Sequence, residues 1–154
     1  MTTIYNVIDT IKQHLREHPI VNTVTFGNVL EVGLDKTTIY PLSHFELGPA
    51  TVESNVINVT LQFLFLDILD KTNEYDGEDL GGREDKTNLI DIYNTQLQIA
   101  NDLISHLRRG DLHADKFHLV GDPVCNPFRD RFENELAGWA VSIDVQVPNN
   151  ISVC

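Results

Sequence analysis

Basic residues are scarce in this 154-residue chain: 11 Lys and Arg stand against 23 Asp and Glu, which gives a net charge of −12. Binding to phosphate backbones or to anionic lipid needs a cationic surface, so this balance argues against adhesive contact with nucleic acid or with a membrane. The apolar share of 42% and the charged share of 22% are typical of a folded globular protein and not of a disordered chain.

Cysteines and long apolar runs are also few. Cys125 and Cys154 are too few for a disulfide framework, which predicts a reducing compartment. The longest apolar-rich run, 56–69, is interrupted by polar residues and does not predict a membrane span. The first residues lack the basic start of a secretory signal. We therefore expect a soluble intracellular protein that folds as a single domain over 1–154, with no metal and no cofactor.

Two stretches have the three-to-four-residue apolar spacing of an amphipathic helix. The first covers 4–18, after which Pro19 prevents continuation because it has no amide hydrogen. The second covers 89–107, and Gly110 is placed to end it.

Most of the remaining chain has the pattern of strands. The run 56–69 is apolar on one face throughout, whereas its other face begins polar and ends apolar, which predicts that this end is covered by a helix or by a neighbouring subunit. Pro41 suggests an edge or a bulge in its strand. The predicted strands are 24–26 with 29–32, 38–47, 56–69, 117–120 and 139–147, and the stretch 121–128 is predicted to be a loop.

The segment 70–86 breaks these patterns. Its seven acidic residues and three glycines predict a mobile acidic loop. The remaining order is helix, three strands, helix, two strands. This order predicts an α+β fold, in which two main helices pack on one face of a mostly antiparallel twisted sheet.

One motif suggests catalytic chemistry. His14, Glu17 and His18 match the H-x-x-E-H string of inverted zinc peptidases, in which the histidines bind zinc and the glutamate activates water. The predicted helix ends directly after this motif, at Pro19, and the sequence indicates no third zinc ligand. We therefore favour solvated His14 and Glu17, with His18 packed at the edge of the apolar stripe. No other catalytic motif is present, so the chain is not expected to be an enzyme.

Three further stretches, 38–45, 126–139 and 147–154, resemble small neck and tail proteins of tailed bacteriophages, in particular of crAss-like and related short-tailed phages. The predicted order of elements also resembles the tail-terminator or tail-completion fold over nearly the whole chain. The resemblance implies a structural virion protein that is assembled in the host cytoplasm. It would be a subunit of a homo-oligomeric ring, of six or twelve copies, in the neck between head and tail.

The partners that the resemblance implies are other copies of the chain, the adjacent portal, connector or tail rings, and genomic DNA that passes without specific binding. The negative charge of the chain suits the inner surface of a ring through which DNA passes, because like charge keeps the DNA phosphates from adhering. Two arginines among aromatic residues are typical of an interface, although the two phenylalanines could equally anchor the connection into the last strand. The expected subunit contacts are Phe128, Arg129, Asp130, Arg131 and Phe132, and the expected lumen or inter-ring loop carries Asp76, Glu78 and Asp79.

Two other functions stay open. The chain could be a monomeric adaptor or assembly chaperone whose acidic loop binds a basic partner, with a strong salt dependence. It could also be a zinc-dependent hydrolase that uses His14, Glu17 and His18. In that case the purified protein would hold stoichiometric zinc, and mutation of either histidine would remove it.

Overall fold

The computed structural model describes residues 4–28, 39–69, 89–129 and 136–149. The predicted strand 29–32 and the predicted acidic loop 70–86 lie outside this part of the chain. The elements in chain order are α1 (Ile4–Arg16), β1 (Thr23–Phe26), β2 (Leu42–Val52), β3 (Val56–Ile68), α2 (Leu89–Arg109), α3 (Asp111–Ala114), β4 (His118–Val120), β5 (Cys125–Arg129) and β6 (Leu136–Pro148).

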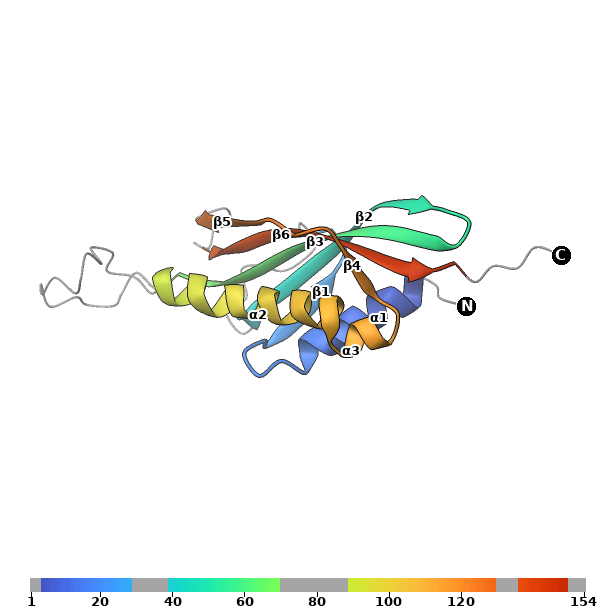
Figure 1. Ribbon diagram of the computed structural model, residues 1–154. Coiled ribbons are helices and arrows are strands. Elements are labelled where there is room, and N and C mark those ends of the chain that lie inside the picture. Colours follow the sequence, from blue (N-terminus) through green and yellow to red (C-terminus); the bar gives the residue numbers. More distant parts are fainter. Residues whose placement is uncertain (1–3, 29–38, 70–88, 130–135, 150–154) are drawn as a thin grey trace, which may run out of the picture.

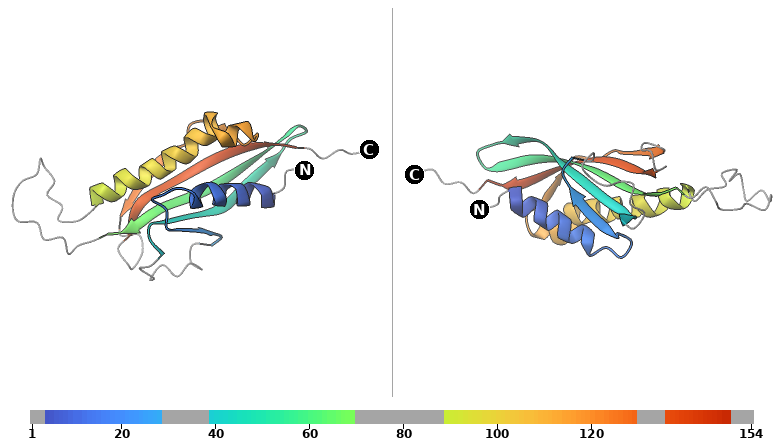
Figure 2. Two further views of the ribbon diagram at one scale, coloured as in Figure 1. Left: turned by 90° about the horizontal axis from the view of Figure 1, so that it is seen from below. Right: turned by 180° about the vertical axis from the view of Figure 1, so that it is seen from behind.

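The fold is the predicted α+β arrangement of a mostly antiparallel sheet with two main helices on one face (Figures 1 and 2). The strand order is β1-β2-β3-β6-β4, with β5 also paired to β6. The strand β1 runs parallel to β2, and the other pairs are antiparallel. The long strands β3 and β6 pair over their whole length and form the centre of the sheet.

The two main helices, α1 and α2, end within two residues of their predicted ends. The helix α1 buries Val7, Ile11 and Leu15, which are spaced by four residues and so lie on one face. It ends at Arg16, shortly before Pro19. The helix α2 ends at Arg109, where the amide of Gly110 donates to the carbonyl of His106 at 3.1 Å, as the position of this glycine predicts.

One segment that the sequence predicts to be a loop contains a strand in the structure. The sequence indicates an irregular connection over 121–128, but β5 forms at Cys125–Arg129 and pairs with β6 from Cys125↔Val141 to Arg129↔Ala137. The strand β4 pairs with another part of the same edge of β6, so β4 and β5 form an interrupted edge strand. Pro127 is tolerated in β5 because an edge strand need not donate from every residue.

Pro41 also differs from its prediction, because it lies before β2 and not inside a strand. Its carbonyl oxygen accepts hydrogen bonds from the amides of Asn22 and Thr23, at 3.0 and 3.2 Å. The start of β2, Leu42–Phe45, lies between β1 and β3 and is therefore internal to the sheet.

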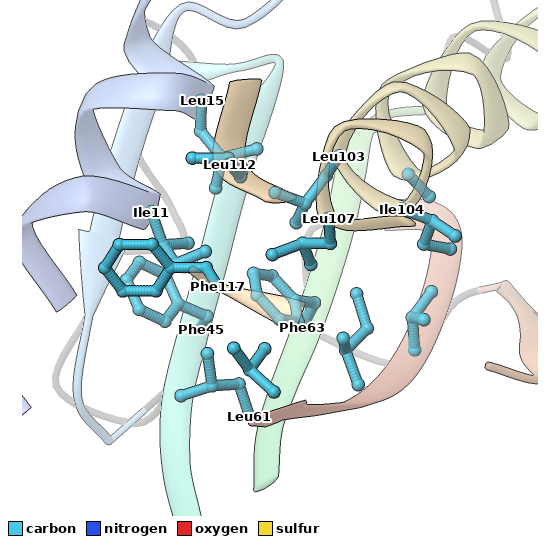
Figure 3. Close-up of a cluster of buried hydrophobic side chains, with 14 of the residues drawn as sticks. Ile11, Leu15, Phe45, Leu61, Phe63, Leu103, Ile104, Leu107, Leu112 and Phe117 are labelled. Atoms are coloured by element: carbon cyan, nitrogen blue, oxygen red, sulfur yellow. The ribbon is translucent and has the colours of Figure 1, made fainter. Parts of the chain in front are cut away.

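The main core lies between the sheet and the helices. Leu103 and Leu107 of α2 and Ile11 of α1 point toward Phe45 and Phe63 of the sheet, as Figure 3 shows. The rings of Phe45 and Phe63 stack with their centroids 5.3 Å apart. Burial of side chains of this size stabilises the fold by roughly 1.5–3 kcal/mol each.

A second, smaller cluster lies on the opposite face of the sheet. Phe65 belongs to the main core, and successive strand residues point to opposite faces, so Leu66 points away from the helices. It is fully buried with Tyr40, Leu42 and Leu136. The apolar end of β3 is therefore covered, at least in part, by residues of its own chain.

Candidate functional site

The residues predicted to form a subunit interface lie at the end of β5. Phe128 is half-buried and packs against the second cluster, and its carbonyl oxygen accepts a hydrogen bond from the Tyr93 hydroxyl at 3.3 Å. Arg129, the last residue of β5, is exposed. Phe128 therefore anchors the end of β5 to the second cluster, whereas Arg129 lies on the surface. The other predicted contacts and loop residues lie outside the described residues: Asp76, Glu78, Asp79, Asp130, Arg131 and Phe132.

The zinc-peptidase string does not assemble into a site. His18 lies beyond the end of α1, and its Nδ1 accepts a hydrogen bond from the amide of Ile20 at 3.2 Å. Glu17 is exposed, and its Oε1 accepts from Gln13 Nε2 at 3.1 Å. The three side chains of the string therefore have different neighbours.

His14 instead forms a cluster with two residues of α2. Its Nε2 lies 3.1 Å from Asp102 Oδ2, and its ring centroid lies 4.7 Å from that of His106. His106 Nδ1 lies 3.5 Å from Asp102 Oδ1. One nitrogen or oxygen atom from each residue lies within 4.8 Å of the others, and in the described part of the chain this is the group of three that could hold a metal ion.

The cluster is half-buried between α1 and α2. The side chains of His14, Asp102 and His106 are exposed by 15%, 36% and 34%. Burial lowers the pKa of His14, although the Asp102 carboxylate acts in the opposite direction. The expectation of a solvated His14 is therefore wrong, because the side chain packs against the second helix.

Sequence reasoning missed Asp102 and His106 as partners of His14. Their spacing of four residues on a predicted helix places them on one face, and this signal was available. The contact between His14 and Asp102 spans 88 positions of the chain, and His106 is farther still along the sequence, so no local pattern encodes this cluster.

A groove of about 400 Å³ runs between α2 and the connection from β4 to β5. Leu97 and Ile104 line its helix side, and Asp122, Pro123 and Cys125 line the other side. Arg108 Nη2 lies 3.1 Å from Asp122 Oδ1, and both side chains are well exposed, so this ion pair adds little stability. Burial raises the pKa of the Cys125 thiol, which disfavours the nucleophilic thiolate.

Large apolar side chains are exposed in two separate groups. The first, which we call the hairpin patch, consists of Ile4 and Tyr5 of α1 with Leu47 and Val52 of β2. The second, the α2 patch, consists of Ile90 and Leu97 of α2, and Leu97 lines the groove. Two other exposed side chains of this kind, Val120 and Val124, line a separate hollow with Ser142 and Asp144. The start of α1 and the β2–β3 hairpin lie at one end of the molecule, and α2 begins at the other end (Figures 1 and 2).

No helix in the described residues has both the length and the apolar content that a membrane crossing needs. Neither a protein-family model nor a curated protein matches the sequence.

Proposed function

We propose that the chain is the subunit of a homo-oligomeric ring in the head-to-tail neck of a tailed bacteriophage, and that genomic DNA passes through this ring. The observation that carries the proposal is the pair of separate apolar patches on one chain. Tyr5 is 82% exposed in the hairpin patch, and Ile90 is 49% exposed in the α2 patch. Exposed apolar groups of this kind are typical of interaction surfaces.

Two different patches suit a ring better than a two-fold dimer. A two-fold contact joins the same patch on both copies, whereas a ring joins one patch to a different patch on the next copy. We therefore expect the hairpin patch of one subunit to contact the α2 patch of its neighbour.

The edges of the sheet favour contact between subunits through side chains and not through the pairing of strands. The edge formed by β4 and β5 is interrupted at 121–124 and contains Pro127. Among the described residues, the opposite edge consists of the four-residue β1 and of 46–52 of β2, a stretch that contains Pro49 and an irregularity in its pairing with β3. Short or interrupted edges with proline resist pairing with another sheet. The charge of −12 further supports a lumen that DNA passes without adhering.

Native mass spectrometry over a wide range of concentrations tests the proposal. We expect a closed ring of six or twelve copies in the wild-type chain. A monomer at every concentration would contradict self-assembly without a template and would favour the adaptor.

A mixing experiment tests the head-to-tail contact. Val52→Glu in the hairpin patch and Leu97→Glu in the α2 patch should each abolish the ring, because each places a charge in an apolar contact. An equimolar mixture should then form a heterodimer and nothing larger, since one intact contact remains between the two variants. Ala114→Glu, which adds the same charge at an exposed position outside both patches, should form normal rings.

The predicted contacts at the end of β5 have their own test. Replacing Arg129 and Arg131 with alanine should leave a folded subunit that does not assemble. Normal rings from this double variant would remove both arginines from the interface, and they would leave the two-patch contact to be judged by the mixing experiment.

A further inference from the structure

We propose that His14, Asp102 and His106 form a binding site for a divalent transition-metal ion such as Zn²⁺, and that the ion links α1 to α2. The three side chains converge from two helices, and one nitrogen or oxygen atom of each lies within 4.8 Å of the others. This site goes beyond the ring function and does not depend on it. It differs from the zinc-peptidase string, with which it shares His14.

The donor set suits Zn²⁺. Two imidazole nitrogens with one carboxylate oxygen are common zinc ligands, whereas Mg²⁺ and Ca²⁺ prefer oxygen ligands alone. Two donors bonded to a tetrahedral ion at about 2.0–2.1 Å lie about 3.3–3.4 Å apart. The separation of 3.1 Å between His14 Nε2 and Asp102 Oδ2 is close to this value.

The hydrogen bonds around the cluster orient one of the rings. His106 Nδ1 lies 2.8 Å from the carbonyl oxygen of Asp102. A carbonyl oxygen only accepts, so Nδ1 carries the proton, and Nε2 of the neutral ring keeps its lone pair. A backbone carbonyl that fixes the second nitrogen of a histidine is typical of metal-binding histidines.

Binding of the ion requires the proton of the His14 ring to move from one ring nitrogen to the other. In the metal-free pair, the neutral His14 ring donates from Nε2 to Asp102 Oδ2. When the ion binds, Nε2 supplies its lone pair and the ring proton moves to Nδ1, so the ring stays neutral. The half-exposed Asp102 and His106 give the ion access from solvent, and water completes its coordination.

The ion would replace the hydrogen bond between His14 and Asp102 with a stronger link between the two helices. A ligand that binds the folded chain and not the unfolded chain raises its stability by mass action. Because all three ligands come from one chain, we expect one ion per chain whether or not the chain assembles.

Titration of the chelator-treated full chain with Zn²⁺, followed by calorimetry and by thermal unfolding, tests the site. We expect one Zn²⁺ per chain, a higher Tm, and slower amide hydrogen exchange in α1 than in the metal-free chain. Asp102→Asn and His106→Gln should each weaken Zn²⁺ binding by more than about 100-fold. Even the loss of a residue that only hydrogen-bonds to a metal ligand lowers metal affinity by about 10–100-fold.

Two control variants separate this site from other donors. His118→Gln removes a histidine that is not part of the cluster and whose ring centroid lies 4.2 Å from that of His113, and Cys125→Ser removes a free thiol. Both should bind Zn²⁺ as the wild type does. The proposal is overturned if the wild-type chain binds no Zn²⁺, if Asp102→Asn binds it equally well, or if either control loses it. Asp102→Asn keeps the size of the side chain, so this comparison holds even if a histidine variant fails to fold.

Discussion

Gln96 lies on the buried side of α2, with a fully buried side chain. Among the described residues, neither its Nε2 nor its Oε1 has a hydrogen-bond partner. A buried polar group without a partner costs about 1–3 kcal/mol, because it loses its hydrogen bonds to water without replacement. The helix thus contains a local source of instability that its apolar periodicity does not reveal.

Replacing Gln96 with Met should therefore stabilise the chain by about 1–2 kcal/mol. The volume is similar, and the unpartnered amide is removed. Urea unfolding followed by the fluorescence of Trp139, the single tryptophan, measures the change. Gln98→Met is the matched control, because Gln98 is exposed on the same helix and its replacement should change stability by less than about 0.5 kcal/mol. Equal effects of the two substitutions would contradict the argument.

Two histidines, the buried His44 and the half-buried His14, should make stability depend on pH. Burial lowers the pKa of His44, whose Nε2 is buried without a partner among the described residues, and burial also lowers the pKa of His14. The folded-state pKa of each is then below its unfolded value, so the unfolded chain binds more protons. Their stabilisation is present above about pH 6.5 and is lost as the pH falls from there through the lowered folded pKa.

Unfolding at several values between about pH 7.5 and about pH 5.5 measures this dependence. We expect the free energy of unfolding to fall with falling pH, and we expect a smaller fall in His44→Gln and in His14→Gln. The double variant should show the weakest dependence. A double variant with the full wild-type dependence would show that other groups titrate in this range.

At the scale of single elements, α2 has two apolar faces with different roles. Leu103 is fully buried in the main core, where Figure 3 shows it above Phe63. Leu97 is 39% exposed and lines the groove. One helix therefore both stabilises the fold and presents the surface that we propose as a ring contact.

Alanine substitutions at these two positions should separate the roles. Leu103→Ala should lower the free energy of unfolding by about 2–5 kcal/mol, because it leaves a cavity in a packed core. Leu97→Ala should lower it by less than about 1 kcal/mol, since the side chain is only partly buried, and should weaken ring formation. Chemical unfolding and native mass spectrometry report the two effects. A folded Leu97→Ala chain with undiminished rings would place the contact elsewhere.

At the scale of the whole molecule, charge opposes association. Each copy carries −12, so copies repel one another at low ionic strength. Salt screens this repulsion over a Debye length of about 10 Å at 0.1 M.

Ring formation should therefore increase with salt concentration, provided that the contact is apolar. Sedimentation velocity at low and at high ionic strength measures the fraction assembled. Dissociation at high salt would show that ion pairs dominate the contact, and it would favour the arginines at the end of β5 over the two apolar patches.

The periodic elements α1, β3, α2 and β6 could be predicted from local patterns in the chain. Residues such as Val7, Ile11 and Leu15 or Ile143, Val145 and Val147 repeat at the period of a helix or a strand, and burial of one face makes that period a local property of the chain. Pro19 marked the end of α1 for an equally local reason, since it has no amide hydrogen. Gly110 follows the last residue of α2, but it does so in an extended conformation with φ −106° and not in the left-handed conformation of a glycine cap.

The tertiary structure alone decided the contacts between distant segments. It paired Cys125–Arg129 with β6 although Pro127 and the surrounding turn residues favoured a loop, because an edge strand needs few of its own donors. It also brought His14 to Asp102 and His106, since the meeting of α1 and α2 depends on how both helices pack on one sheet. Such contacts depend on which faces meet in space, and no pattern within either segment specifies that choice.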